Sequence, residues 1–309
     1  MNETAGRGQP GSGPPRPDAM IGGRRVAGIG LGTAPLAFGD GTAEDAVATV
    51  RAALDAGVGL IDTALAYTRP GIESYAEQVV AYALRGSTGE RPLVATKGGH
   101  WRHGDHFPVD GRPAALRAHC DISLRTLGVD RIDLYFLHHV DPAVPLADSV
   151  GALEQLRREG KIAAVGLSNV TVAQLDEALV VAPVDAVQNR LSYADPADLP
   201  TAEACARRGL AYLAYAPLTA PSGPPLRAAL HVARRRQASV QRVMLAWLRE
   251  QAPNIVPLVG ASRPASIRDS ADLLALTPDD LTDLGAAPHL DIAPEQHAEG
   301  ANIPEDEDP

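Results

Sequence analysis

The sequence predicts a single (β/α)8 TIM barrel, and two observations carry that prediction. Short apolar runs alternate with amphipathic stretches across residues 21–292, which is typical of parallel strands joined by helices. An open sheet would show the same alternation. Closure into a barrel is favoured because eight strand–helix pairs can be counted and no break in composition divides them.

Each predicted strand is a short apolar run bounded by polar or glycine-containing turns. The runs are VAGIGLGT (26–33), GLIDTA (59–64), PLVATK (92–97), IDLYFLHH (132–139), AAVGLSN (163–169), DAVQN (185–189), AYLAYAP (211–217) and NIVPLVG (254–260). Between them, apolar residues recur at helical spacing. The stretch 43–57 stops at Gly57, and the stretch 149–161 closes on basic residues and Gly160.

The two ends of the chain differ from the predicted barrel. Residues 1–20 are rich in Gly and Pro and lack the apolar core of a signal peptide, so we expect a disordered tail on a cytoplasmic protein. Residues 293–309 are polar and acidic and predict a flexible C-terminal tail. No run is long and apolar enough to predict a membrane span.

Composition indicates the kind of partner. The chain has 28 Lys and Arg against 38 Asp and Glu, a net charge of −10, which disfavours nucleic acid and anionic lipid and favours a small-molecule substrate. Its two cysteines, Cys120 and Cys205, have no metal-like spacing, and we expect them to be reduced and buried. Nothing in the sequence indicates an oligomeric state.

Every predicted strand ends in a chemically capable residue. These residues are Thr33, Asp62, Lys97, His138, Asn169, Gln188, Tyr215 and Ser262. If the strand ends had no function, polar residues would be scattered along the strands, or the ends would carry the Gly and Ser that are usual in turns. Barrel enzymes assemble their active sites at the carboxyl ends of the strands, so the sequence predicts a catalytic site there.

Several motifs at these strand ends match one known family in order and strand position. DTALAY (62–67), ATK (95–97) and DLYFLHH (133–139) resemble the catalytic tetrad of the aldo-keto reductases. The likeness continues through GLGTA (30–34), GKIAAVGLSN (160–169), VQN (187–189), AYAPL (214–218) and VGASRP (259–264). The resemblance covers the whole predicted barrel and implies an NAD(P)H-dependent enzyme that reduces an aldehyde or ketone.

The chemistry of the implied reaction explains why four residue types should meet. Hydride added to a carbonyl carbon builds negative charge on the oxygen, so the site needs a proton donor, for which Tyr67 is the candidate. The ammonium of Lys97 would make this phenol a better acid, and Asp62 would keep Lys97 charged. His138 would orient the carbonyl. We choose it over His139 because successive strand residues face opposite ways and the family pattern places the catalytic histidine first.

Each of these residues also has an ordinary structural interpretation. Taken singly, Tyr67 could be a loop tyrosine, Asp62 a helix cap and His138 a core histidine. A barrel brings all the strand ends to one rim, so the interpretations are not independent and the functional one is favoured.

The resemblance also implies bound NADPH, although no GxGxxG opens a helix after the first strand. The implied cofactor contacts are Gly32, Thr33, Asp62, Ser168, Asn169, Gln188, Tyr215, Ala216, Pro217, Leu218, Gly260, Ser262 and Arg263. Within this set, Ser168, Asn169 and Gln188 would bind the carboxamide, and the ring of Tyr215 would stack on the nicotinamide.

The phosphate contacts implied by the resemblance decide the type of cofactor. The backbone of 216–218 would approach the pyrophosphate, and Ser262 with Arg263 would bind the 2′-phosphate, which favours NADPH over NADH. The segment departs from the common pattern at Asp269 and Ser270, where Glu and Asn usually contact the adenine. This departure leaves the strictness of the NADPH preference open.

The loop 98–111, GGHWRHGDHFPVDG, is unusually rich in aromatic residues and histidine. We expect Trp101 and Phe107 to wall the substrate pocket. His100, His103 and His106 raise the alternative of a metal site. No cysteine lies nearby and no helix aims the rings, so we expect none.

Two alternatives to a carbonyl reductase stay open. Some proteins that resemble this family are cofactor-binding regulatory subunits of membrane channels with little turnover. A barrel enzyme using Lys97 as a Schiff-base nucleophile would need a lysine of depressed pKa, which Asp62 argues against.

Overall fold

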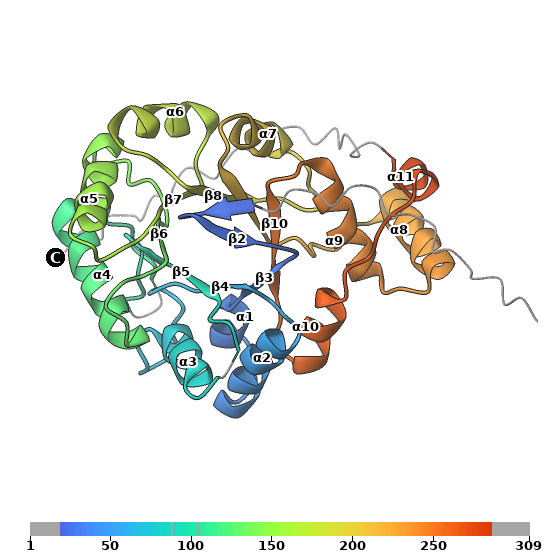
Figure 1. Ribbon diagram of the computed structural model, residues 1–309, viewed down its shortest axis with the longest axis horizontal. Coiled ribbons are helices and arrows are strands. Elements are labelled where there is room, and N and C mark those ends of the chain that lie inside the picture. The colour runs from blue at the N-terminus through green and yellow to red at the C-terminus, as the bar shows by residue number, and fades with distance from the viewer. Residues whose placement is uncertain (1–18, 88, 104–105, 286–309) are drawn as a thin grey trace, which may run out of the picture.

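The computed structural model describes residues 19–87, 89–103 and 106–285, and eight parallel strands among them close into a barrel surrounded by helices (Figure 1). The barrel strands are β3 (Gly30–Gly32), β4 (Leu60–Asp62), β5 (Leu93–Gly98), β6 (Leu134–Leu137), β7 (Val165–Ser168), β8 (Ala186–Arg190), β9 (Ala211–Tyr215) and β10 (Ile255–Gly260). Each pairs with its neighbour in sequence, and β10 pairs with β3 to close the sheet. All eight predicted strands and the barrel are confirmed.

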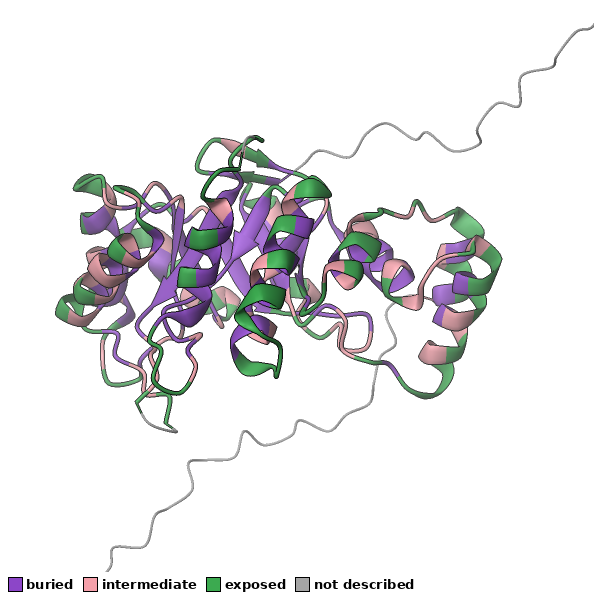
Figure 2. Ribbon diagram, turned by 90° about the horizontal axis from the view of Figure 1, so that it is seen from below, coloured by how far each residue is buried: buried purple, intermediate pink, exposed green. Residues whose placement is uncertain are grey.

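Helices follow the barrel strands and cover the outside of the sheet. They are α1 (Ala34–Phe38), α2 (Ala43–Asp55), α3 (Tyr75–Leu84), α4 (Pro113–Leu127), α5 (Leu146–Arg158), α6 (Val172–Val181), α7 (Leu199–Arg207), α8 (Gly223–Arg236), α9 (Val240–Gln251), α10 (Pro264–Ala271) and α11 (Pro278–Leu284). Figure 2 shows the buried strands enclosed by helices whose outward faces are exposed. The predicted helix stops at Gly57 and Gly160 are confirmed, since both glycines have positive φ just past a helix end.

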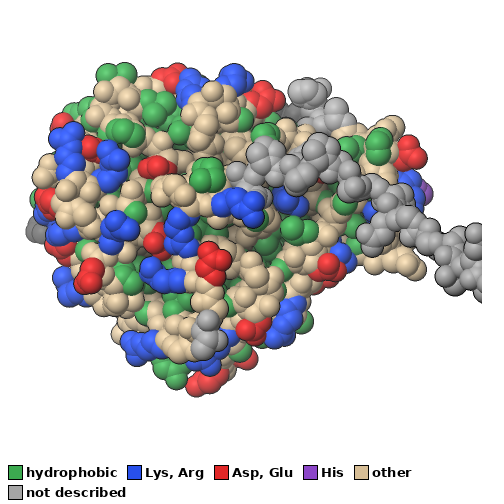
Figure 3. All heavy atoms as spheres, in the orientation of Figure 1, with side chains coloured by type: hydrophobic (Ala, Val, Ile, Leu, Met, Phe, Trp, Pro, Cys, Tyr) green, Lys and Arg blue, Asp and Glu red, His purple; other side chains and the backbone are tan. Residues whose placement is uncertain are grey.

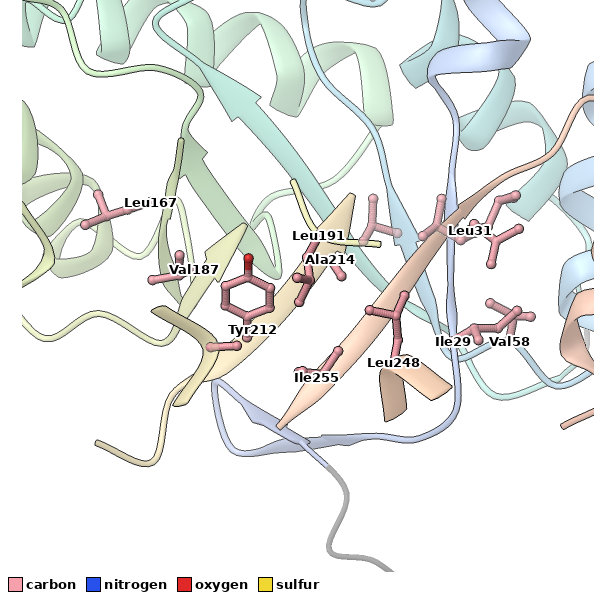
Figure 4. Packing of buried hydrophobic residues seen from close by; sticks show 14 of the residues in the cluster. Ile29, Leu31, Val58, Leu167, Val187, Leu191, Tyr212, Ala214, Leu248 and Ile255 are labelled. Carbon is pink, nitrogen blue, oxygen red and sulfur yellow. The ribbon is translucent and has the colours of Figure 1, made fainter. Parts of the chain in front are cut away.

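Side chains of the barrel strands alternate between two apolar layers, as a period of two requires. On β5, Leu93 and Ala95 belong to the cluster inside the barrel, whereas Val94 belongs to the cluster between sheet and helices. Figure 4 shows part of this outer layer, including Val187 from β8 and Ile255 from β10. Because register fixes the facing of every strand residue, it also fixes which strand-end residues point into the barrel.

A short hairpin closes the amino end of the barrel. Strands β1 (Ala19–Ile21) and β2 (Arg24–Val26) are antiparallel and are joined by Gly22 and Gly23, both with positive φ. Such a two-glycine turn matches the twist of the strands that it joins. Ile21 and Val26 are buried in the same cluster as the barrel interior. The hairpin therefore acts as the floor of the barrel core.

The hairpin corrects the expected limits of the N-terminal tail. Ala19 and Met20 lie in β1, although the sequence placed them in a disordered segment over 1–20. The remainder of that segment, the boundary at 292/293 and the tail 293–309 lie outside the described residues. Within 19–87, 89–103 and 106–285, no helix has the length and apolar character needed to cross a membrane. Cys120 and Cys205 are free and buried, as expected.

We predict that Gly166→Ala destabilises the barrel. A Cβ at Gly166 on β7 would lie 2.3 Å from two ring carbons of Phe136, which fills the interior beside it. Forced overpacking of this kind costs about 1–3 kcal/mol, and thermal unfolding should show a correspondingly lower midpoint. Gly151→Ala in α5 is the matched control. No atom lies within 4 Å of a Cβ at Gly151, so alanine should raise stability there by about 0.5–1 kcal/mol. Equal midpoints for the two variants would contradict the prediction.

Candidate active site

The polar residues at the carboxyl ends of the strands continue the interior-facing positions. Asp62 follows Leu60, and Lys97 follows Ala95, at intervals of two. The same alternation applies on other strands to His138, Ser168, Gln188 and Tyr215. The sheet therefore directs these side chains toward one end of the barrel interior.

Lys97 and Asp62 form a buried ion pair at this end. The Lys97 side chain is 0% exposed, and its Nζ donates to Asp62 Oδ1 at 2.8 Å and Oδ2 at 2.7 Å. It also donates to the carbonyl of Thr63 at 2.9 Å, while Gln188 Nε2 donates to Asp62 Oδ1 at 2.8 Å. Burial is the largest single influence and acts to lower the pKa of Lys97, but the charges of Asp62 and Tyr67 and the hydrogen bonds to both together outweigh it, and the pKa lies above its usual value. Lys97 is thus a fixed, fully bonded cation.

Tyr67 lies beside this cation on the segment between β4 and α3. Its backbone N–H donates to the carbonyl of Ala64, and its own carbonyl accepts from Ala76 at the start of α3. Nζ of Lys97 lies 3.3 Å from the Tyr67 hydroxyl oxygen. Burial raises the pKa of Tyr67 above its ordinary value, and Lys97 only partly opposes this. The phenol therefore keeps its proton at neutral pH, next to a charge that stabilises its anion.

His138 is packed against Tyr67. The two ring centroids are 5.9 Å apart with the rings edge to face, and His138 is 8% exposed. Burial, then the charge of Lys97, lowers the pKa of His138 well below its usual value, so the imidazole is neutral. Its Nδ1 is buried without a hydrogen-bond partner among the described residues. A neutral imidazole has one donor and one acceptor to offer to a ligand.

His139 corrects one expectation from the sequence. We expected it to face away from His138, but the two rings are stacked at 5.0 Å with an interplanar angle of 16°. The reason is that β6 ends at Leu137. His138 still follows Phe136 on the interior side, but alternation no longer fixes the side on which His139 lies. His100 contacts both rings at 4.9 Å, and burial together with His139 lowers the pKa of His100 to about 4.

An aromatic wall stands over Tyr67, and the sequence anticipated only part of it. Phe38 lies edge to face with Tyr67 at 5.7 Å, and Phe107 lies 6.0 Å from Phe38. Phe107 also stacks on His100 at 5.7 Å. Phe38 and Phe107 are 53% and 39% exposed, so Phe38 presents apolar surface beside the phenol and Phe107 extends that surface toward His100. Trp101, by contrast, packs against His119, with the ring centroids 5.3 Å apart.

The sequence offered one signal for Phe38 that we did not use. Phe38 is the last residue of the short segment that follows Thr33 at the end of the first barrel strand. An aromatic residue at such a place often lines a pocket at the carboxyl face of a barrel.

Ser168, Asn169 and Tyr215 form one hydrogen-bonded group at neighbouring strand ends. Asn169 Nδ2 donates to Ser168 Oγ at 3.1 Å and to the carbonyl of His138 at 3.0 Å. The Tyr215 hydroxyl donates to Asn169 Oδ1 at 2.9 Å. Asn169 and Ala216 have φ of 58° and 52°, an uncommon backbone for residues other than glycine, especially alanine. Strained backbone of this type gathers where a ligand is held.

A second group of the expected cofactor contacts lies where β3 meets β10. Gly32 and Gly260 are partners in the strand register, and Thr33 Oγ1 donates to the carbonyl of Asp62 at 3.0 Å. Ser262 and Arg263 are exposed just before α10. These residues therefore lie at the carboxyl ends of β3 and β10, which belong to the same barrel end as Asp62 and Lys97.

Pro217 and Leu218 continue the chain from Ala216, with Pro217 buried and Leu218 half-buried. The two residues that depart from the family pattern are already engaged: Asp269 Oδ2 accepts from Ser239 Oγ at 2.6 Å, and Ser270 is buried.

The histidines of the loop 98–111 do not converge. His103 and His106 are exposed and bond to each other through their backbones, while the ring of His100 contacts His138 and His139. Over the described ranges, no group of three or more His, Cys, Asp or Glu side chains is arranged to hold a metal ion.

Comparisons with known proteins find relatives along most of the chain. A model of the Aldo/keto reductase family matches residues 28–223. An uncharacterized oxidoreductase of Schizosaccharomyces pombe is 32% identical over 248 residues, which make up 79% of this chain and 76% of the relative. The range 28–223 includes Asp62, Tyr67, Lys97 and His138, whereas Arg263 lies beyond it.

Two solved structures extend the likeness to the whole fold. The glycerol dehydrogenase from Gluconobacter oxydans has a TM-score of 0.75 at 26% identity, covering 87% of this chain and 94% of that one. An aldo/keto reductase from Klebsiella pneumoniae, solved in complex with NADP and acetate, has a TM-score of 0.69 at 26% identity, with the same coverage of 87% and 94%.

Proposed function

Because the chain belongs to the aldo/keto reductase family, whose members are NAD(P)H-dependent oxidoreductases, we propose that it reduces an aldehyde or ketone to an alcohol with hydride from NADPH. We assign Tyr67 as the general acid, assisted by Lys97, Asp62 and His138. One observation carries this assignment above the others. The buried ammonium of Lys97 is held by both oxygens of Asp62 and lies 3.3 Å from the hydroxyl of Tyr67.

The proton is held on Tyr67 Oη until the carbonyl oxygen becomes negative. Burial keeps the phenol protonated by raising its pKa, so the donor is in the correct form at neutral pH. As the proton leaves, the phenolate forms next to Lys97, whose positive charge stabilises it. Asp62 acts through Lys97 by keeping that cation in place, which makes it a positioning residue.

His138 orients the carbonyl in this proposal. A neutral imidazole donates one hydrogen bond without competing as an acid, and its ring lies edge to face with Tyr67. The aromatic wall of Phe38 and Phe107 keeps water from the same oxygen. A drier site strengthens each hydrogen bond to the developing charge.

The residues at the strand ends fit a nicotinamide cofactor. The carboxamide of nicotinamide has the same donor and acceptor groups as the Asn169 side chain. It can therefore form hydrogen bonds of the same kind with the polar side chains of Tyr215, Ser168 and Gln188. The half-buried ring of Tyr215 leaves a face for stacking, and exposed Arg263 suits a phosphate. When bound, the reduced nicotinamide supplies the hydride. The Klebsiella relative was solved with NADP, which supports the same cofactor here.

The remaining expected contacts belong to this proposal in the same way. Gly32, Thr33 and Gly260 border the cofactor site where β3 meets β10, and the backbone of 216–218 is proposed to approach the pyrophosphate. Trp101 and Phe107 remain proposed substrate contacts. The small-molecule carbonyl as partner and the cytoplasmic location also stay predictions from the sequence.

The direct test mixes the purified protein with NADPH and a panel of aromatic aldehydes, short-chain aldehydes and ketones. We expect absorbance of the reduced nicotinamide to fall with at least one carbonyl compound and not without one. Binding of NADPH with no reduction of any compound would favour the regulatory-subunit alternative. Trapping of a carbonyl adduct on Lys97 by borohydride would instead favour Schiff-base chemistry, which the raised pKa of Lys97 opposes.

Arg263→Ala is expected to weaken NADPH binding by about 10- to 100-fold and NADH binding by less than about twofold, since one charge-assisted contact to the 2′-phosphate is removed. Fluorescence titration with each cofactor measures both constants. Arg268→Ala, which removes an exposed arginine of α10, is the control and should leave both constants unchanged. A parallel loss of NADPH and NADH affinity in Arg263→Ala would argue against a 2′-phosphate contact.

A further inference from the structure

A cavity of about 1020 Å³ lies at the opposite end of the barrel from the catalytic residues. It is bordered by strand β2, by the turns that precede β4 and β5, and by the carboxyl end of α3. Hairpin β1–β2 is drawn in front in Figure 1, and Figure 3 shows the same face, where many Lys and Arg side chains are visible in blue. The proposed reduction uses none of these residues.

The residues lining this cavity carry an excess of positive charge. Five are arginines, against Asp55 and Glu90 as the acidic residues of the lining. The arginines are Arg24, Arg25, Arg51, Arg85 and Arg91. The whole chain has a net charge of −10, so a cationic cavity of this kind stands apart from its average surface. A cavity lined by one sign of charge concentrates counter-ions of the opposite sign.

Two of these arginines share one carboxylate at a long distance. Arg24 and Arg91 approach Asp133 at 3.4 and 3.7 Å, beyond the usual length of about 2.7–2.9 Å for a charge-assisted hydrogen bond. One oxygen of Asp133 also accepts from the backbone N–H of Val94 at 2.9 Å. Asp133 therefore offsets one of the two positive charges, and Arg24 also donates to the carbonyl of Arg91 at 2.6 Å. With Asp133 included, the arginines around the cavity still outnumber the carboxylates.

The lining has no side chain at Gly59, which is exposed. Its φ lies outside the left-handed region, so the backbone there accepts any residue. A Cβ at Gly59 would meet no atom within 4 Å. The backbone just before β4 is therefore accessible from the cavity.

We propose that this cavity is a binding site for a multivalent phosphate anion, separate from the cofactor site. The guanidinium fork matches a pair of phosphate oxygens, and several arginines around one space suit a ligand with two or more phosphate charges. The volume lies just above the range of about 300–1,000 Å³ found for small-molecule sites, so a phosphorylated metabolite fits.

The test is calorimetric titration of pyrophosphate into protein saturated with NADP⁺, which blocks the phosphate contacts of the cofactor site. We expect binding to one site, with affinity that falls as NaCl is raised. The variant Arg51→Gln/Arg85→Gln should weaken binding by at least about tenfold, because it removes two of the positive charges that line the cavity. Gly59→Leu, which fills the open space, should abolish binding.

The matched control is Arg227→Gln/Arg234→Gln, which removes the same charge from exposed positions of α8. It should bind pyrophosphate within twofold of the parent protein. All variants are first checked for an unchanged unfolding midpoint and NADPH-dependent activity. Absence of binding to the parent protein, equal weakening by the two double variants, or tighter binding of citrate than of pyrophosphate would each overturn the proposal.

Discussion

Tyr67→Phe is expected to lower kcat for carbonyl reduction by about 10²- to 10⁴-fold, the range associated with loss of a general acid. The change removes only the hydroxyl that lies 3.3 Å from Lys97 Nζ. The phenylalanine ring keeps the edge-to-face contacts with Phe38 and His138, so the pocket should keep its shape. Single-turnover measurements with NADPH and the best substrate of the panel give the rate of the chemical step.

Two accompanying measurements make the result specific to the proton. NADPH affinity should stay within about twofold, since the hydroxyl is not among the proposed cofactor contacts. Tyr82→Phe, on the exposed side of α3, is the control and should keep full activity. If Tyr67→Phe retained most of its single-turnover rate, the proton donor would have to be another group, and His138 would be the next to test.

Lys97→Met is expected to destabilise the fold by about 3–5 kcal/mol as well as abolish reduction, because it leaves the carboxylate of Asp62 buried without its cation. In the parent protein both oxygens of Asp62 accept from Lys97 within 2.8 Å. Denaturation by urea, followed by circular dichroism, measures the loss in unfolding free energy.

A second variant separates stability from catalysis. Asp62→Asn/Lys97→Met removes both charges and should recover most of the lost stability while remaining inactive, because the phenolate of Tyr67 would still lack its cation. Lys161→Met is the surface control. Its partner Asp121 is partly exposed at 2.6 Å, and such pairs contribute at most about 1 kcal/mol. A stable Lys97→Met protein would show that Asp62 is compensated in another way.

The sequence predicted the part of this site that regular strands determine. Asp62, Lys97 and Gln188 occupy interior-facing positions because strand residues alternate, and one barrel end collects them because all eight strands are parallel. Both rules depend on short apolar runs that are visible in one sequence. The Lys97–Asp62 pair, which the family resemblance implied, could therefore be predicted. The hydrogen bond from Gln188 to Asp62 was not, because Gln188 was expected to bind the carboxamide.

Outside the regular strands the sequence was a poorer guide. His139 lies beyond the end of β6, where alternation no longer applies, and its ring stacks on His138. Phe38 contacts Tyr67 because it ends the five-residue helix α1, which is too short to show a periodic pattern in the sequence. Glu77 is fully buried and accepts from Thr96 at 2.6 Å, a contact between a helix and a strand that depends on packing alone.

The hairpin at the amino end was missed for a different reason. Its strands have three residues each, too short for an alternating pattern, and a Gly- and Pro-rich segment precedes them. Its burial is visible only once the barrel provides an interior for Ile21 and Val26.

The closure of the barrel also sets the order in which this chain can become a folded protein during its synthesis. Gly30 is paired with Leu258, and the hairpin β1–β2 packs near β9. Residues that are synthesised early therefore form these contacts only after β9 and β10 have been synthesised. Until β10 leaves the ribosome, β3 and β9 are open edges, and the apolar residues of the hairpin have no interior to enter. Contacts so distant in sequence slow folding and expose the nascent chain to aggregation. A ribosome that stalled before Ile255 would thus hold a chain with most of its helices and no closed core.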